Sequence, residues 1–270
     1  RYTVMLTQAG SGYSTCDGID VTRWREDATS DCWGQYFYIR DLDGGGAWSA
    51  GRQPLGGDPD EYEAMLGSDR AVFQRRDADI ETRYEIAVAS DADAEVRRIT
   101  LTNHGGLPRT LDVCSYAEVS LNGRRADQAH PAFAKLFLET EYLPAPTTLL
   151  CRRRPRARDQ KPIWALHFLA DPERADSAVG EVEYETDRAK FLGRGRSSAC
   201  PAALDLGAAL SGTVGPVLDP VFSLRRRVRL APGTSAVLAF GNAIAADRNE
   251  AVALALRFSD LAEVARTFEQ

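Results

Sequence analysis

The sequence predicts a mainly β protein, an antiparallel sandwich that ends in short helices. Apolar residues recur at every second position in many separate segments, which is the period of half-buried strands. Clusters of Gly, Pro, Asn and Asp separate these segments, as expected for turns between antiparallel strands. The apolar period becomes helical only near the C-terminus, so strands do not alternate with helices as they do around a parallel sheet.

The opening segment predicts a strand at residues 2–7 and a glycine turn at residues 10–12, where the backbone can take positive φ. Tyr13 follows this turn, and Arg23 and Trp24 end the second arm. A guanidinium beside a flat indole suits a sugar ring or a tight subunit contact. A plainer interpretation also fits, in which Trp24 is simply part of the core.

The same alternation predicts a series of further strands. It is clearest at residues 80–88, and it is longest at residues 111–121, which is typical of a large curved sheet. A short helix is expected near residues 202–210, and the five arginines of residues 151–158 indicate a solvated loop or strand end. The predicted strands are residues 36–40, 48–53, 71–76, 80–88, 95–103, 111–121, 134–142, 164–169, 180–186, 222–230 and 234–243.

The last segment predicts one or two amphipathic helices. Asp247 and Glu250 have the spacing of a capping box. Apolar residues then recur at spacings of four and three, so the helices carry a stripe that needs a partner. We therefore expect a β-domain over residues 1–245 and the start of a helical linker over residues 246–270. The apolar positions are Leu254, Phe258, Leu261, Ala265 and Phe268.

The composition describes an ordinary soluble globular protein. Hydrophobic residues make up 44% of the 270 residues and charged residues 27%. The net charge of −6 disfavours nucleic acid as a partner. Five scattered cysteines without CxxC spacing indicate free thiols in a reducing compartment. There is no long apolar run and no signal-peptide pattern, and because both ends fall within predicted elements we expect a piece of a longer protein.

The sequence offers no catalytic group and no metal site with the required spacing. No two of the histidines share a helix turn or a strand face with a nearby carboxylate; the three are His104, His130 and His167. Glu139 and Glu141 point to the same side of one predicted strand, but a solvated face explains them more simply than glycoside chemistry does. The glycines near residue 11 form neither a nucleophile elbow nor a phosphate loop.

Several motifs in order along the chain resemble one known family, the glycosyltransferase-36 type domain of the family 94 glycoside phosphorylases. Residues 184–196 and 218–233 are most similar to the version found in cyclic β-1,2-glucan synthases of the NdvB type. Several ordered motifs are far more specific than one. The motifs are YTVMLT, GSGYS, VTRWRED, YFYIRDLD, WSAGRQP, EVRRITLTNHG, HPAFAKLFLETEY, YETDRAKFLGRGR and LDPVFSLRRRVRLAPG.

This resemblance implies a β-supersandwich similar to galactose mutarotase-like sandwiches, joined by linker helices to an (α/α)6 barrel. It also implies inverting phosphorolysis, in which a barrel aspartate protonates the leaving oxygen while inorganic phosphate attacks the anomeric carbon. Phosphate would be a co-substrate of the parent enzyme, and no cofactor is expected. Because no barrel sequence lies within these 270 residues, we expect this piece alone to be catalytically silent.

The resemblance also suggests which residues face the barrel or a glucan. The expected partners are a β-1,2-glucan or related oligosaccharide, the barrel of the parent chain and a second copy of the protein. The implied parent is anchored in the inner membrane, with this soluble domain on the cytoplasmic side. The expected site residues are Tyr13, Ser14, Arg23, Trp24, His130 and Phe133.

The sequence leaves three other functions open. The sandwich could grip β-glucan by itself through Trp24 and Tyr13, or it could serve only as a structural or oligomerisation module. A mutarotase-type epimerase is a further alternative, and it would require a histidine and a glutamate over one sugar.

Overall fold

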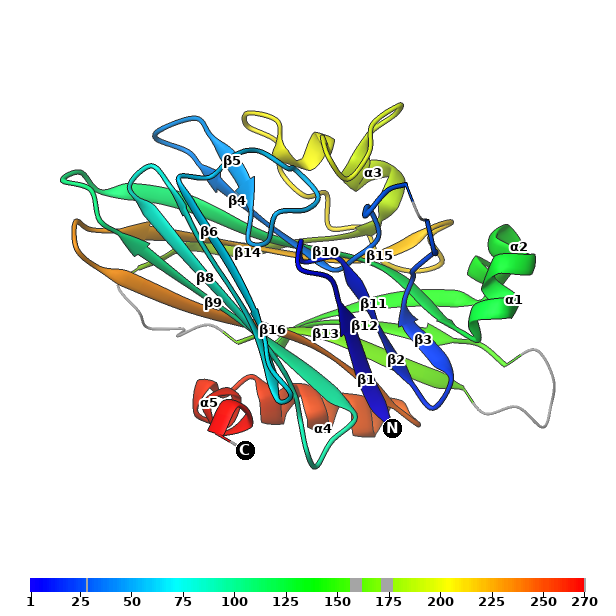
Figure 1. Ribbon diagram of the computed structural model, residues 1–270. Helices are drawn as coiled ribbons and strands as arrows, with labels where there is room; N and C mark the ends of the chain where they lie inside the picture. Colours follow the sequence, from blue (N-terminus) through cyan, green and yellow to red (C-terminus); the bar gives the residue numbers. More distant parts are fainter. Residues whose placement is uncertain (28, 156–161, 171–176, 270) are drawn as a thin grey trace.

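Two eight-stranded antiparallel sheets lie face to face and form a sandwich, which confirms the predicted fold class (Figure 1). The computed structural model describes residues 1–27, 29–155, 162–170 and 177–269. Helices cover the outer face of the second sheet, and residues 188–218 cover part of the outer face of the first (Figure 1). Each sheet is therefore buried on its inner face and is also partly covered on its outer face.

The first sheet is built around β10, whose 14 residues make it the longest strand described. One edge of β10 pairs with β15, while the other edge pairs first with β4 and then with β3. Its length allows two strands to share that edge. The order is β1 (Tyr2–Leu6), β2 (Gly12–Cys16), β3 (Ile19–Thr22), β10 (Arg109–Asn122), β15 (Pro220–Leu230) and β14 (Ala178–Asp187), with β4 (Tyr36–Asp41) and β5 (Ala47–Ser49) beside β10.

The second sheet is a continuous antiparallel array. Its strands β9 and β8 pair in register from Ile80 opposite Asn103 to Val88 opposite Glu95, so the alternation predicted for residues 80–88 is confirmed. The order is β11 (Leu138–Pro144), β12 (Thr147–Arg153), β13 (Ile163–Ala170), β16 (Ser235–Ala245), β9 (Ala94–Asn103), β8 (Ile80–Val88), β7 (Arg70–Asp77) and β6 (Glu61–Leu66).

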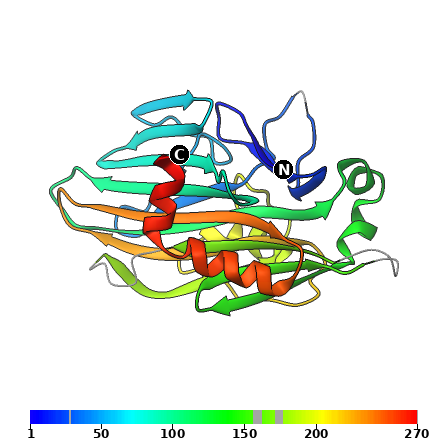
Figure 2. The ribbon, with the colours of Figure 1, turned by 90° about the horizontal axis from the view of Figure 1, so that it is seen from below.

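Two helices end the chain as predicted, α4 (Arg248–Phe258) and α5 (Leu261–Glu269), and they lie across the outer face of the second sheet (Figure 2). The Asp247 carboxylate accepts a hydrogen bond from the Glu250 backbone N–H at 2.9 Å, as a capping box requires. Phe258 and Phe268 are buried against the sheet. The division into a domain that ends at residue 245 and a linker stays a prediction.

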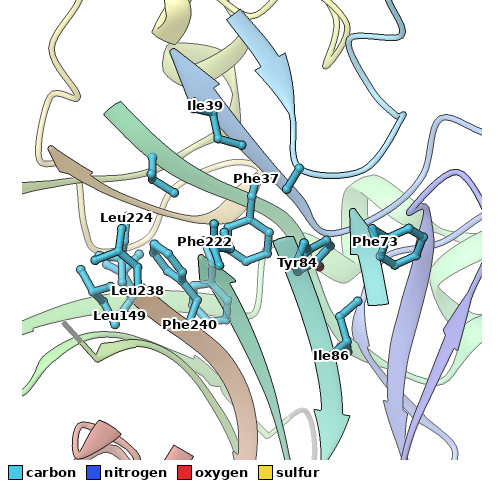
Figure 3. Packing of buried hydrophobic residues seen from close by; sticks show 14 of the residues in the cluster. Phe37, Ile39, Phe73, Tyr84, Ile86, Leu149, Phe222, Leu224, Leu238 and Phe240 are labelled. Carbon is cyan, nitrogen blue, oxygen red and sulfur yellow. The ribbon is translucent and has the colours of Figure 1, made fainter. Parts of the chain in front are cut away.

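Aromatic side chains from both sheets fill the space between them (Figure 3). Phe37 on β4 lies 4.9 Å from Phe240 on β16 and 5.3 Å from Tyr84 on β8, measured between ring centroids. Such tilted and edge-to-face contacts stabilise the core beyond the burial of apolar area alone. The alternation that predicted these strands thus places one side of each strand in a single core.

A buried polar network crosses the same space. The Glu95 side chain is fully buried on β9 and accepts hydrogen bonds from Tyr2 at 3.0 Å, from Ser14 at 2.5 Å and from Asn242 at 2.7 Å. Arg97 donates to its second oxygen from Nε at 2.9 Å and from Nη2 at 2.6 Å. Because Tyr2 and Ser14 belong to the first sheet, this carboxylate connects the two sheets.

His167 extends the network on the other side of Asn242. Its Nδ1 atom lies 2.8 Å from Asn242 Oδ1, and its Nε2 atom lies 2.8 Å from the Ser115 hydroxyl. Burial lowers the pKa of His167 to about 4. The ring is therefore neutral, with Nδ1 donating to Asn242 and Nε2 accepting from Ser115.

Local structure differs from the prediction in several places, among them the strand predicted at residues 48–53, of which only the first two residues belong to β5 (Ala47–Ser49). The strand predicted at residues 134–142 is wrong in its first part, because α2 (Pro131–Lys135) is helical and β11 starts only at Leu138. Proline is well suited to the first turn of a helix, which explains the helical start. The helix predicted near residues 202–210 is only a 3-10 turn, η1 (Ala202–Leu204). The opening arms form three strands, and β6 was not predicted.

Some predicted segments lie partly or wholly outside the described residues. The arginine-rich segment begins inside β12, and its residues 156–158 lie outside the described residues. Residues 171–176, between the strands predicted at residues 164–169 and 180–186, lie outside them as well. The remaining helices are α1 (Arg124–Ala129), which precedes α2, and α3 (Arg188–Leu192), which follows β14.

We predict that His167 makes stability depend on pH in a defined window. Its pKa is about 4 in the folded protein and 6.5 ordinarily, so the unfolded chain takes up the proton first as pH falls. Stability is complete above pH 6.5 and declines between pH 6.5 and 4, by roughly 3 kcal/mol in total. Urea unfolding at several pH values should show a shallower decline for His167→Gln than for the unchanged protein.

His104 provides the matched control, because it lies exposed at a turn beside Glu81. His104→Gln should keep the pH dependence of the unchanged protein. Equal slopes for all three proteins between pH 6.5 and 4 would contradict the role assigned to the buried ring.

Candidate functional site

The candidate site is a pocket of about 350 Å³ on the outer face of the first sheet, over β4 and β10. We call it the tyrosine pocket. The loop of residues 30–34, residues 53–54 and the loop of residues 197–199 form its rim. The lining residues that matter most for its chemistry are Arg23, Trp33, Tyr36, Tyr116, Glu118 and Arg188.

Two tyrosines form the floor of the tyrosine pocket. Tyr36 and Tyr116 stand directly opposite each other in the pairing of β4 with β10. Phe191 from α3 stacks on Tyr116 with ring centroids 4.7 Å apart, so the covering segment fixes the ring. Burial raises the pKa of both hydroxyls above the ordinary value, so both keep their protons and can donate hydrogen bonds.

A carboxylate lies beside the tyrosines. Glu118 Oε1 accepts from Arg188 Nε at 2.6 Å and from the Tyr116 hydroxyl at 3.1 Å. Its Oε2 atom accepts from Arg23 Nη1 at 3.2 Å. The carboxylate therefore sits between two guanidinium groups, one buried and one about a third exposed.

Arg23 is the buried member of this group. Its Nε and Nη2 atoms donate to the two oxygens of Asp127 on α1 at 3.0 and 3.1 Å. Burial alone would lower the pKa of Arg23, but the carboxylates of Asp127 and Glu118 outweigh that effect and raise it. Arg23 is therefore a permanent cation that joins the pocket to α1.

Asp219 completes what we call the ion cluster. It lies 2.6 Å from Lys135 Nζ, 3.5 Å from Arg23 Nη1 and 3.7 Å from Arg188 Nη1. The cluster contains three cations and three carboxylates, so its formal charges cancel. Its members are Arg23, Lys135, Arg188, Glu118, Asp127 and Asp219.

Tyr13 and Trp24, two of the expected site residues, lie together outside the tyrosine pocket. Their ring centroids are 5.3 Å apart at an angle of 43°. The Arg124 guanidinium lies over both rings, 4.0 Å from the Tyr13 centroid and 5.3 Å from that of Trp24, and Asp20 holds it with two bonds of 3.0 Å. A side chain of the protein itself thus occupies the ring faces that a sugar would need.

Ser14 and Arg23 are buried rather than exposed. The Ser14 hydroxyl lies inside the sandwich and donates to Glu95, so it presents nothing at the surface. Arg23 is 2% exposed and lines the tyrosine pocket, but its donors are directed at carboxylates. Of the six expected residues, Arg23 alone lines this pocket.

His130 and Phe133 lie on what we call the α1–α2 segment, residues 124–137, at one end of the sandwich (Figure 1). His130 is exposed at the junction of the two helices. Phe133 and Leu136 are 51% and 53% exposed, and Phe133 contacts Phe137 edge-to-face at 5.2 Å. The segment therefore presents an apolar surface.

The sequence alone did not reveal Tyr36, Tyr116, Glu118 or Arg188 as a site. One signal was present, because the second face of the strand at residues 111–121 also carries an aromatic residue and a carboxylate. A strand that is apolar on one face and carries bulky residues on the other is typical of a sheet covered on both sides.

The geometry required by an epimerase is not found here, since no histidine is among the described residues that line the pocket.

The fold places the chain among large two-sheet β-sandwiches, as a comparison with solved structures shows. Part of a polysaccharide lyase superposes with a TM-score of 0.54 at 14% identity, over 96% of this chain and 34% of that one. At this identity the likeness concerns the fold alone. The family model described as "Glycosyl hydrolase 94, supersandwich domain" matches residues 1–261, and the chain belongs to this family.

Known relatives agree with this assignment. The cyclic β-(1,2)-glucan synthase NdvB of Rhizobium meliloti (strain 1021) is 38% identical over 92% of this chain. The N,N'-diacetylchitobiose phosphorylase of Vibrio proteolyticus is 26% identical over 86% of it. The matched regions are only 9% and 28% of those proteins, so the chain corresponds to one part of much longer relatives. The family inferred from the motifs is confirmed.

We predict that Arg23 is essential for stability. Arg23→Met leaves Asp127 and part of Glu118 buried without a countercharge, and breaking a buried ion pair in this way costs roughly 3–5 kcal/mol. Urea unfolding should show this loss. Arg196→Met is the control, because Arg196 pairs with Asp205 at an exposed position, and it should leave the unfolding midpoint nearly unchanged. An equally small effect of both variants would argue against the ion cluster as a structural centre.

Proposed function

We propose that this chain is an accessory domain of a larger enzyme that makes or phosphorolyses β-glucans. The observation that carries the proposal is the apolar surface of the α1–α2 segment, where Phe133 and Leu136 are each more than half exposed. Large apolar side chains gathered at one place on a surface mark a contact with another protein element. The family assignment and the greater length of the relatives support a contact with the rest of a parent chain.

The segment is also held rigidly enough to serve as a contact. Asp127 bonds to Arg23, Lys135 pairs with Asp219, and Arg124 packs over Trp24. A surface fixed in this way loses little conformational entropy when a partner docks. We propose an (α/α)6 barrel of the parent as the partner, with His130 and Phe133 in the contact.

The proposed parent reaction is an inverting displacement, with a β-1,2-glucan or a related oligosaccharide as the substrate and inorganic phosphate as the second reactant. The general acid would come from the barrel, so this chain would contribute shape and packing rather than chemistry. A second copy of the protein is a further proposed partner. We also propose that the domain lies on the cytoplasmic side of a membrane-anchored parent; no helix in the described part of the chain is long and apolar enough to cross a bilayer.

The 270-residue chain should be inactive by itself. When it is incubated with inorganic phosphate and β-1,2-glucooligosaccharides, no glucose 1-phosphate should form above the rate without protein. A coupled assay with phosphoglucomutase measures this product directly. Formation of glucose 1-phosphate at a rate proportional to protein concentration would place a general acid inside this chain and overturn the accessory role.

Replacing Phe133 and Leu136 by Ser should impair the parent enzyme while sparing this domain. We expect glucan turnover by the parent to fall about tenfold or more, since truncating apolar residues at the centre of an interface commonly costs over 1 kcal/mol. The thermal midpoint of the isolated chain should change little, because both side chains are more than half exposed.

Leu256→Ser is the control, since Leu256 is 58% exposed on α4, which covers the opposite sheet. It should leave turnover by the parent unchanged. Unaltered turnover in the Phe133 and Leu136 variant would show that this surface is not the contact.

A further inference from the structure

We propose that the tyrosine pocket binds a neutral sugar, namely one or two hexose units at the end of a glucan or of a short oligosaccharide. The pocket is separate from the exposed apolar surface of the α1–α2 segment, and the proposal does not depend on docking to a parent. Four properties of the pocket support it: its balanced charge, its mixed donors and acceptors, its aromatic walls and its size.

The charge balance favours a neutral ligand over a phosphate or a nucleotide. The charged side chains at the floor belong to the ion cluster, in which three cations face three carboxylates. Arg23 directs its donors at Asp127 and Glu118. An anion at the floor would meet the Glu118 carboxylate, and the buried cation beside it, Arg23, is already paired with Glu118 and Asp127.

The polar groups of the pocket can both donate and accept. Arg188 is about a third exposed and lines the pocket, so its guanidinium can donate to a ligand as well as to Glu118. The Gln53 side-chain amide also lacks a partner among the described residues, and it lies at the rim. Tyr36 places its hydroxyl near Ser11, at 3.1 Å. Sugar hydroxyl groups are donors and acceptors at once, so they match such a mixture.

The walls suit the flat faces of a pyranose ring. Trp33 is partly exposed at the rim, and the Arg25 guanidinium lies 5.5 Å from the centre of its ring. Tyr36 and Tyr116 form the floor. Aromatic rings combine apolar contact with a polar edge, as a sugar requires. At about 350 Å³ the pocket is near the lower end of the range for small-molecule sites, which favours one or two sugar units.

A longer oligosaccharide would have a path out of the pocket. A second hollow of about 390 Å³ shares Ser30, Cys32 and Trp33 with the tyrosine pocket and reaches Trp24. Units beyond the first would lie in this second hollow along Trp33, because Arg124 covers the Trp24 ring. The tyrosine pocket would hold the end of the chain.

The test is a titration of the 270-residue protein with sugars, in which binding is measured by ligand-observed NMR and by calorimetry. The probes are glucose, the β-1,2-linked glucose disaccharide and glucose 1-phosphate. We expect saturable binding of the neutral sugars, with the disaccharide at least as tight as glucose and the phosphorylated sugar weaker. Absence of saturable binding of either neutral sugar up to the high-millimolar range, or tighter binding of glucose 1-phosphate, would overturn the proposal.

Two variants locate the site. Ala199→Trp places a bulky ring into the pocket from an exposed position on its rim, so it should abolish binding without disturbing the core. Arg188→Met removes a donor to the ligand and should weaken binding roughly tenfold. Glu118 keeps its bond from Arg23 in this second variant, which favours normal folding.

Two controls separate this proposal from the docking role. Arg196→Met removes an arginine from the same covering segment outside the pocket lining, and Phe133→Ser changes the α1–α2 segment. Both should bind sugar as the unchanged protein does. Unaltered affinity in folded Ala199→Trp protein would place any sugar elsewhere, whereas loss of affinity in Phe133→Ser alone would assign it to the α1–α2 segment. Either result overturns the proposed pocket and leaves the docking test intact.

Discussion

The buried carboxylate of Glu95 is the constraint on which the arrangement of the two sheets depends. A fully buried charge is tolerated only when it is paired and when its remaining lone pairs accept hydrogen bonds. Glu95 belongs to the second sheet, but two of its partners, Tyr2 and Ser14, belong to the first. Among the described strands, β1 and β2 join the rest of the first sheet only through β3, so these bonds help to hold the opening segment in its place.

The position of the opening segment in turn fixes the candidate site. Arg23 follows the last residue of β3, and its guanidinium meets Glu118 in the tyrosine pocket and Asp127 on α1. A displacement of β3 would leave the Asp127 carboxylate without its cation and Glu118 paired with Arg188 alone. The core network and the ion cluster are therefore linked through the opening segment, which the Glu95 bonds hold in place and from whose end Arg23 reaches the cluster.

Sequence reasoning predicted the fold well and the site poorly, for a physical reason. Strand period is a local property. The buried face of a strand such as residues 80–88 can therefore be read from its own residues, whatever strands pair with it. The tyrosine pocket depends on the pairing of β4 with β10, which sets Tyr36 opposite Tyr116, and that register is not visible in either segment alone. The polarity of Ser14 also suggested a surface position. In the structure Ser14 is buried and donates to Glu95, which is distant in the sequence.

The ion cluster also bears on whether sugar binding at the tyrosine pocket and docking at the α1–α2 segment affect each other. Arg23 bonds to Glu118 at the pocket and to Asp127 on the α1–α2 segment, so one buried side chain contacts both. A ligand shifts an equilibrium only when it binds two states with different free energies. Here the cations and carboxylates are already paired, and moving one would expose an unpaired buried charge at a cost of several kcal/mol. A neutral sugar supplies no charge to offset that cost. The structure therefore favours a rigid connection, in which sugar binding and docking use the same scaffold but do not change each other's affinity.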